Sequence, residues 1–197
     1  MRVRDIVNKW KEPNNGSRTI MESIMVPEVR QAFDMWIKNV PKGEFVLIGG
    51  LALSYHGIVR STEDVDCLYK SGTNIPEDVV GFKHHRKSAF EHKRTGVEIE
   101  TVYPEMFNDI SHLLVQQVFN TAINHDGVLI ASKNGLVALK AQAMRTGAKG
   151  ARDRSDIMEL LDLGEIDVSS YHISEDATRY VDHLRKELTA PHPFNPR

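Results

Sequence analysis

Two aspartates stand two residues apart in the segment Asp64-Val65-Asp66. Side chains two residues apart on a β-strand point to the same face, so a strand here brings the two carboxylates together. Like charges held that close are unfavourable unless a cation lies between them or one carboxyl takes up a proton. A hard divalent ion is the usual solution, and Mg²⁺ typically binds one or two carboxylates together with substrate phosphates. The pattern therefore predicts a Mg²⁺ site, with Mn²⁺ as the alternative ion.

A glycine pair, Gly49 and Gly50, follows the apolar run of residues 45–48, which is typical of a strand covered on both faces. Neither glycine has a Cβ, so the backbone can turn sharply and approach another group closely. A short helix is expected over residues 51–56, and amides at a helix N-terminus favour a phosphate group. The two motifs together indicate a metal-bound nucleoside triphosphate, with Gly49 and Gly50 as nucleotide-binding residues.

The spacing of these motifs resembles the signature of the nucleotidyltransferase superfamily that includes DNA polymerase β. Here two glycines are followed by thirteen residues and then by Asp-Val-Asp, and the segment 56–66, HGIVRSTEDVD, is similar to the small bacterial members. Those members include toxins of type IV toxin–antitoxin systems and antibiotic nucleotidyltransferases. The resemblance implies that Asp64 and Asp66 are catalytic metal ligands. It also implies transfer of a nucleotide from an NTP to an acceptor hydroxyl, with release of pyrophosphate.

A second predicted strand offers a third carboxylate. Residues 88–93 and 97–103 are expected to form a hairpin around a turn at 94–96, with Glu98 and Glu100 on one face of its second strand. The superfamily has a third acidic residue on a strand beside the aspartates, and the resemblance assigns this catalytic and metal-binding role to Glu100. Glu98, on the same face, is a rival candidate. The other interpretation is a solvated acidic edge strand.

A helix predicted over residues 134–145 carries a charged residue within its apolar stripe, because Leu136, Leu139, Lys140 and Ala143 recur at helical intervals. An unpaired ammonium there would be costly. Lys140 must therefore reach solvent, pair with a carboxylate, or meet an anion such as a triphosphate. The resemblance implies that this helical lysine holds the triphosphate, whereas a buried ion pair with an aspartate is the structural alternative.

The next predicted helix begins near the sequence Arg152-Asp153-Arg154-Ser155-Asp156. Acidic residues in the first turn of a helix stabilise its dipole, which is one interpretation of Asp153 and Asp156. The toxin-like nucleotidyltransferases open the corresponding helix with a similar Arg-Asp-x-x-Asp pattern. On that resemblance Asp156 is assigned to nucleotide binding together with Lys140.

The length of 197 residues suits one domain with a helical appendage, or two small domains. We expect N-terminal helices over residues 1–40, a nucleotidyltransferase core over 41–132, a C-terminal helical portion over 133–190 and an irregular tail over 191–197. The predicted fold class is α/β, of the α+β kind, with a mixed sheet flanked by helices. Further elements are expected as helices at 2–10, 28–40, 76–80, 109–122 and 174–188, and as a strand at 128–132.

Composition narrows the function classes. With 25 basic and 27 acidic residues the net charge is −2. The protein as a whole therefore lacks the positive field that would indicate a nucleic-acid partner. The basic cluster at residues 83–87 could attract RNA or an acidic substrate, and a solvated loop is the alternative. The single cysteine, Cys67, excludes an internal disulfide. There is no signal-peptide pattern and no long apolar run, so we expect a cytoplasmic protein with no membrane partner.

The acceptor is the part of the function that the residues leave open. A toxin-type enzyme acting on tRNA or on a protein and an enzyme modifying an antibiotic would share the same site residues. The toxin interpretation would add an antitoxin partner. A different class of function, a nucleotide-binding module that keeps the fold without turnover, would retain the NTP site alone.

Overall fold

The computed structural model describes residues 26–40, 42–58, 62–86, 88–106 and 109–190. The helix predicted at residues 2–10, the irregular tail at 191–197 and Arg60 of the resemblance motif lie outside these ranges.

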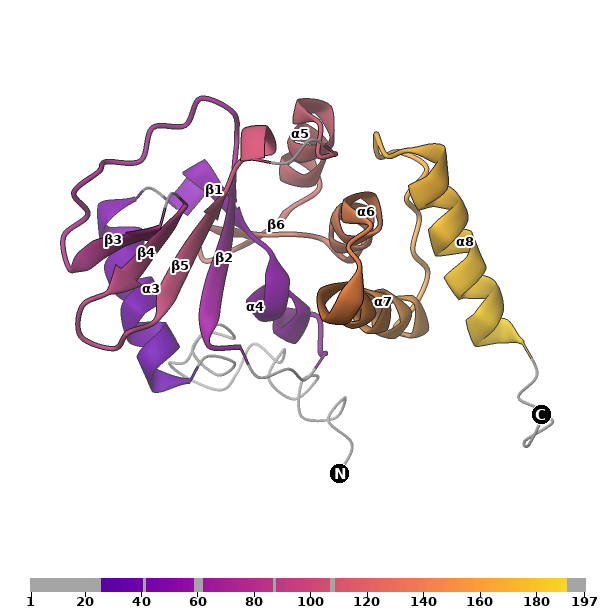
Figure 1. The fold of residues 1–197 in the computed structure, drawn as a ribbon, viewed down its shortest axis with the longest axis horizontal. Coiled ribbons are helices and arrows are strands. Elements are labelled where there is room, and N and C mark those ends of the chain that lie inside the picture. Colours follow the sequence, from indigo (N-terminus) through magenta and orange to yellow (C-terminus); the bar gives the residue numbers. More distant parts are fainter. Residues whose placement is uncertain (1–25, 41, 59–61, 87, 107–108, 191–197) are drawn as a thin grey trace.

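A seven-stranded mixed sheet is the centre of the fold, with the strand order β3-β4-β5-β2-β1-β7-β6 (Figure 1). The central strand β2 lies parallel to β5 and antiparallel to β1, and β1 lies parallel to β7. This mixed sheet with flanking helices confirms the predicted α+β class. Its strands are β1 (Phe45–Leu47), β2 (Asp64–Tyr69), β3 (Phe82–Arg86), β4 (Ala89–His92), β5 (Glu98–Val102), β6 (Ile123–His125) and β7 (Val128–Ile130).

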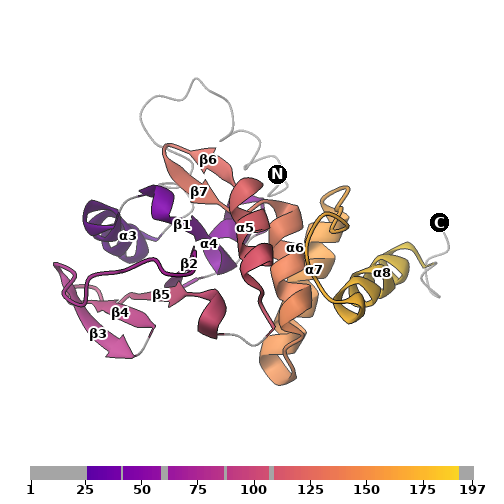
Figure 2. The same cartoon turned by 90° about the horizontal axis from the view of Figure 1, so that it is seen from above.

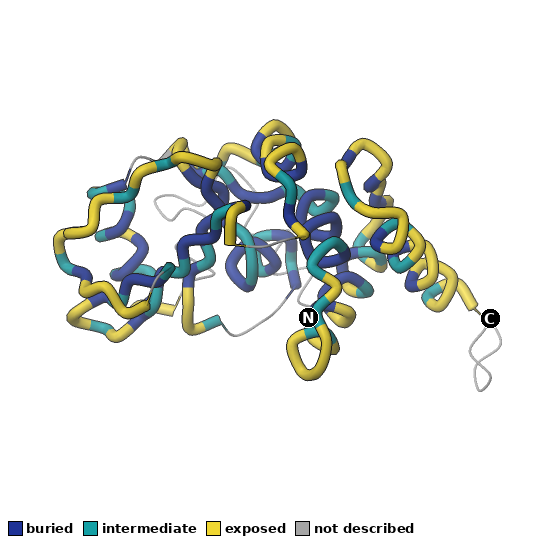
Figure 3. Tube along the Cα trace, turned by 45° about the horizontal axis from the view of Figure 1, so that its top comes forward, coloured by how far each residue is buried: buried dark blue, intermediate teal, exposed yellow. Residues whose placement is uncertain are grey.

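The helices are arranged on both sides of this sheet, and α6, α7 and α8 follow one another outward beyond its centre, with α8 furthest away (Figures 1 and 2). Buried residues concentrate in the central strands and in α6, whereas much of α8 is exposed (Figure 3). The helices are α3 (Pro27–Asn39), α4 (Gly49–Tyr55), α5 (His112–Asn120), α6 (Lys133–Ala143), α7 (Gly147–Asp162) and α8 (Glu175–Thr189).

Helix α3 packs against one part of the sheet through an aromatic cluster. Trp36 is fully buried, its ring lies 5.3 Å from that of Phe82 and 5.1 Å from that of Phe90, and its indole N–H donates to the Tyr69 hydroxyl at 3.1 Å. Aromatic groups of this size account for much of the apolar area that a small domain buries. The cluster holds β2 and β4 in place, and it supports the strand that carries the two aspartates.

Serine caps fix where three of the helices begin. The Ser111, Ser132 and Ser174 hydroxyls each accept a hydrogen bond from a backbone N–H three residues further on. Such a cap satisfies one of the amides that a helix N-terminus leaves unpaired.

Two local predictions are wrong. Residues 76–80 contain a bend and a turn rather than a helix, because a five-residue segment forms too few helical hydrogen bonds to offset the cost of nucleation. The basic segment predicted as a loop is strand β3, which pairs antiparallel with β4 at the edge of the sheet. The short strand β6 was not expected, although Asp126 and Gly127, both at positive φ, form the kind of turn that joins a hairpin.

None of the helices in the described part of the chain is long and apolar enough to cross a membrane.

Candidate functional site

The glycine pair leaves room for groups of the aspartate strand. A Cβ on Gly49, which has φ +61°, would lie 1.7 Å from Asp66 Oδ2, and a Cβ on Gly50 would lie 2.7 Å from Thr62 Oγ1. The backbone N–H of Ile48 also donates to the Asp66 carbonyl at 3.0 Å. Both glycines are therefore required for close packing of the turn against β2, and helix α4 begins at Gly49 itself.

The two aspartates differ in burial, although they share a face of β2. Val65 and Cys67 of the same strand point into the core, while Asp64 is exposed and Asp66 is half-buried. The Thr62 hydroxyl donates to Asp64 Oδ1 at 2.9 Å and lies 3.1 Å from the Asp64 carbonyl. This contact orients the outer carboxylate of the pair.

Strand register brings both glutamates of β5 beside the aspartates. In the parallel pairing of β2 and β5, Asp64 lies opposite Glu98 and Asp66 lies opposite Glu100. Glu98 forms an ion pair with Arg86. Glu100 instead lines the same cleft as both aspartates and lies close enough to Asp66 to raise the pKa of that carboxyl. The structure thus gathers Asp64, Asp66 and Glu100 and leaves Glu98 with a basic partner.

The carboxylate cluster is electrostatically unbalanced. Burial is the main cause that raises the pKa of Asp66, to about 7. The negative charges of Asp64 and Glu100, and the hydrogen bond with Glu100, raise this pKa further, while the positive charge of Lys140 lowers it. A carboxyl group with such a pKa is half-protonated near neutral pH. The cluster therefore relieves its repulsion by holding a proton, which is one of the two solutions expected from the sequence.

The other solution is a cation bound by the carboxylates of Asp64, Asp66 and Glu100. Among the residues that the structure describes, no three His, Cys, Asp or Glu side chains are already arranged to hold a metal ion. The chemistry of the donors nevertheless fits, because Mg²⁺ and Mn²⁺ take carboxylate oxygens and the Gly49 backbone leaves the space into which the Asp66 carboxylate projects. A divalent ion held by Asp66 and Glu100 would relieve the repulsion between the two carboxylates.

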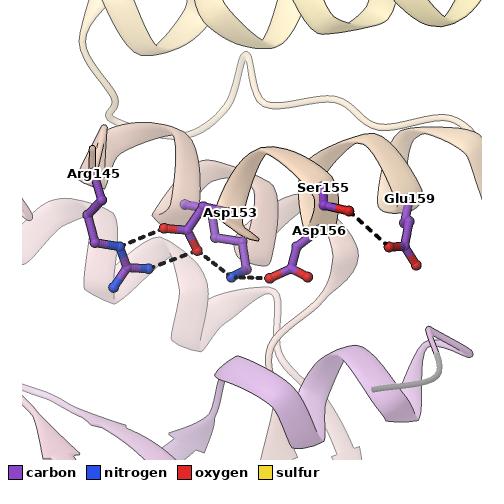
Figure 4. A network of polar contacts seen from close by, with 6 residues as sticks. Arg145, Asp153, Ser155, Asp156 and Glu159 are labelled. Atoms are coloured by element: carbon purple, nitrogen blue, oxygen red, sulfur yellow. Dashed lines mark hydrogen bonds and ion pairs between the residues drawn. The ribbon is translucent and has the colours of Figure 1, made fainter. Parts of the chain in front are cut away.

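Lys140 is buried in an ion-pair network between α6 and α7 (Figure 4). Its Nζ lies 2.8 Å from Asp153 Oδ1 and 2.8 Å from Asp156 Oδ2. Arg145 donates to both oxygens of Asp153, at 2.6 and 3.0 Å. These hydrogen bonds outweigh the effect of burial, so the pKa of Asp153 is lowered. Lys140 therefore has the carboxylate partners of the structural alternative, and Asp156 is one of them.

A cleft of about 740 Å³ separates the two groups. One wall holds Asp64, Asp66 and Glu100 from the sheet. The opposite wall comes from the corner between α6 and α7 and includes basic residues: Lys140, Arg145, Lys149 and Arg152. Gly49 and Gly50 lie on its surface, as do apolar side chains. The cleft is thus lined by carboxylates from the sheet and by four basic side chains, together with Asp153, from the corner between α6 and α7.

Three basic residues that line the cleft were not predicted as site residues: Arg145, Lys149 and Arg152. Lys149 and Arg152 are three residues apart on a helix, a spacing that places side chains on one face. That spacing could have indicated a basic face on the helix. The acidic residues nearby, Asp153 and Asp156, instead favoured the interpretation of an ordinary helix N-terminus.

No protein-family model matches this chain, and a comparison with curated proteins found no match. The fold and the cleft define an α+β protein with a polarised, carboxylate-bearing site.

Proposed function

We propose that this protein is a nucleotidyltransferase that uses a divalent metal ion and moves a nucleotide from an NTP to an acceptor hydroxyl. The observation that carries the proposal is the polarised cleft, in which the carboxylates of β2 and β5 face the basic corner between α6 and α7. A metal–triphosphate complex has the matching pattern, because its cation seeks carboxylates and its phosphates seek basic side chains. The glycine turn and aspartate spacing that resemble the polymerase β superfamily support the same function.

Asp64, Asp66 and Glu100 are the residues that would hold Mg²⁺ or Mn²⁺. An ion bound there would neutralise charge on the triphosphate and on the attacking and leaving oxygens. The basic wall attracts the phosphates and orients the α-phosphorus toward the acidic wall. In the transfer, a bond forms between the acceptor oxygen and the α-phosphorus while the bond to pyrophosphate breaks.

Proton removal from the acceptor hydroxyl is assigned to Glu100. A carboxylate placed beside the acceptor can take up its proton as the bond to phosphorus forms. Glu100 lines the cleft next to Asp66 and stands where the resemblance puts a third carboxylate. The acceptor proton then moves to a carboxylate oxygen and pyrophosphate leaves toward the basic wall.

The class of acceptor lies between RNA, protein and a small molecule such as an antibiotic. The basic strand β3 was a candidate RNA contact, but Lys83 pairs with Glu91 at 2.9 Å and Arg86 pairs with Glu98. These pairs reduce the positive charge that β3 offers to a phosphate backbone. An NTP donor fits a cytoplasmic location, and a toxin-type member would work with an antitoxin partner.

The test is incorporation of label from each α-³²P NTP with Mg²⁺ into total RNA, into protein and into small molecules of a lysate. We expect one fraction to be labelled by the wild type, with pyrophosphate released in equal amount. Asp64→Asn should abolish both signals, while an exposed carboxylate elsewhere, Asp182→Asn, should leave them unchanged. Equal labelling by wild type and Asp64→Asn would refute the proposal. NTP binding without pyrophosphate release would support the non-catalytic module instead.

A further inference from the structure

The four cations of the basic wall differ in their partners. Lys140 is bonded to Asp153 and Asp156, and Arg145 binds Asp153 through two hydrogen bonds. Lys149 and Arg152 are exposed, and within the described ranges neither forms an ion pair with a carboxylate. Two of the four positive charges are therefore already matched inside the protein, and two remain available to a ligand.

The available pair lies at the start of α7. Lys149 and Arg152 are three residues apart, which places them on one face of the helix, and both line the cleft that contains Asp66. Thr146, the N-cap, forms no side-chain cap, and the first turn contains no acidic residue. Amides at this end carry partial positive charge that no side-chain cap offsets. The side chains and the helix end thus attract an anion from the same direction.

We propose that Lys149 and Arg152, with the first turn of α7, hold the β- and γ-phosphates of the nucleotide, or free pyrophosphate. This inference rests on the proposed function for the identity of the donor, but binding of the anion can be measured without turnover. Lys140 and Arg145 then act as positioning residues, because they fix the corner between α6 and α7 through Asp153 and do not touch the phosphates.

The residues favoured by the sequence are less suited to this role. Lys140 is only 9% exposed, and an approaching phosphate would have to displace two carboxylates that lie 2.8 Å away. The space beside Gly49 and Gly50 is filled by Asp66 and Thr62. A phosphate at the glycine turn would also meet the negative charge of Asp66. The face of α7 that carries Lys149 and Arg152 has neither obstacle, because both side chains are exposed and neither is paired with a carboxylate in the part of the chain that the structure describes.

The turn between α6 and α7 holds this face in position. Met144 and Gly147 both have positive φ, at 38° and 65°. A Cβ on Gly150 would lie 2.0 Å from the Arg145 carbonyl, so the chain packs tightly across the corner. Together with the Arg145–Asp153 bonds, this packing fixes the backbone from which Lys149 and Arg152 line the cleft.

The experiment is titration calorimetry of the full chain with inorganic pyrophosphate in EDTA. The test variant is Lys149→Gln with Arg152→Gln. Its matched control is Arg154→Gln with Arg179→Gln, which removes the same charge from residues that pair with Glu187 and Asp176. We expect the test variant to bind about 100-fold more weakly, roughly tenfold for each charged hydrogen bond lost. The control should stay within about twofold, with both variants folded by circular dichroism.

Three results would overturn the inference: no pyrophosphate binding by the wild type, equal binding by the test variant, or equal weakening in the control. The failure of the proposed function is distinguishable from these. Pyrophosphate binding that depends on Lys149 and Arg152, in a protein that labels no acceptor, would remove the enzyme assignment and keep the anion site. Label transfer with an unchanged KM for NTP in the test variant would keep the enzyme assignment and remove the anion site.

Discussion

Two aspartates on opposite walls of one cleft respond to their surroundings in opposite ways. Asp66, on β2, is half-buried among carboxylates, and its pKa is raised to about 7, chiefly by burial. Asp153, on α7, is more buried, yet its pKa is lowered because Arg145 and Lys140 donate hydrogen bonds to it. Burial alone acts in the same direction on both groups. Their neighbours determine the outcome.

The difference suggests how to separate binding residues from structural ones. The Asp153 network satisfies its own charges, so a ligand gains little by entering it. The Asp66 cluster holds repulsion that a proton or a cation would relieve. An unbalanced charged group in a cleft is a candidate for function, and a balanced one is a candidate for stability. Each prediction below tests one side of this contrast.

The largest effect is expected from Asp66→Asn on nucleotide transfer. The asparagine keeps the size of the side chain and removes the charge that would bind the metal ion. We expect the rate of label incorporation to fall about 10³-fold, because the variant would lack a carboxylate that holds the metal ion. Initial rates at saturating NTP and Mg²⁺ give the measurement. A loss below about tenfold would show that the unbalanced cluster is not the reaction centre.

On the balanced side, Lys140→Met should destabilise the fold. Removing one member of a buried ion pair leaves charge without its partner, which costs about 3 kcal/mol of unfolding free energy. The control, Arg154→Gln on α7, breaks the exposed pair with Glu187 and should cost less than about 1 kcal/mol. Urea denaturation measures both values.

A rescue variant sharpens this prediction. Replacing Lys140 by Met together with Asp153→Asn and Asp156→Asn removes the buried charges of both signs, and it should recover much of the lost stability. If Lys140→Met is as stable as the wild type but loses nucleotide binding, the lysine is a phosphate ligand, as the sequence resemblance implied.

Strand patterns made the acidic wall predictable. The alternation along β2 placed Asp64 and Asp66 on one face, and the hairpin of residues 88–103 placed Glu100 on the neighbouring strand. A period of two needs only local sequence, because each residue on a strand has its face fixed by its neighbours. The turn at Gly49 was likewise visible, although its role is to admit the Asp66 carboxylate as well as to bend the chain.

The basic wall was not predictable in the same way. The sequence shows that Lys140 lies in an apolar stripe, but it leaves three outcomes open, and only the packing of α6 on α7 selects the ion pairs with Asp153 and Asp156. Pairing over such distances depends on helix orientation. The prediction of a loop at strand β3 was wrong for a related reason. The exposed basic residues of β3, at the edge of the sheet, lack the apolar alternation by which strands are recognised.

The glycine turn provides the next prediction, which concerns its packing against the acidic wall. Gly49→Ala puts a methyl group where Asp66 Oδ2 now lies, at a backbone φ of +61°. The strain of that φ costs about 1–2 kcal/mol, and displacement of the carboxylate adds to it. We expect a loss of about 2 kcal/mol in urea unfolding, together with weaker Mg²⁺ binding. Gly72→Ala is the control, because it has φ +74° but nothing within 4 Å of the added Cβ. Equal effects of the two changes would show that backbone strain alone is responsible.

Stability against pH tests the charge imbalance without any activity. A carboxyl whose pKa is about 7 when folded and about 4 when unfolded binds more protons in the folded state between those values. Its contribution to stability therefore decreases as pH rises from about 4 to 7. Since Asp66 is only half-buried, we expect a loss of about 1–2 kcal/mol rather than the full effect of the shift.

Asp66→Asn should remove this decrease, so the variant should be more stable than the wild type at pH 8 in EDTA. The contribution of Asp153 to stability changes with pH in the opposite direction. Because the pKa of Asp153 is lowered in the folded state, its carboxylate stabilises the fold above about pH 4, and this contribution is lost as pH falls. Urea unfolding at several pH values resolves the two. A flat difference between Asp66→Asn and the wild type would show that Asp66 is not the group that takes up the proton.

The smallest effect is expected from Glu98→Gln, which compares two glutamates of one strand. Glu98 and Glu100 share a face of β5 and each lies opposite an aspartate, so register does not distinguish them. Their partners do, because Glu98 pairs with Arg86 and lies near His85, whereas Glu100 lines the cleft beside Asp66. Glu98→Gln should leave the transfer rate within about twofold, while Glu100→Gln lowers it at least about 100-fold. If the two substitutions had equal effects, a basic partner would not be enough to exclude a carboxylate from the reaction, and the contrast between balanced and unbalanced charge would lose its predictive value.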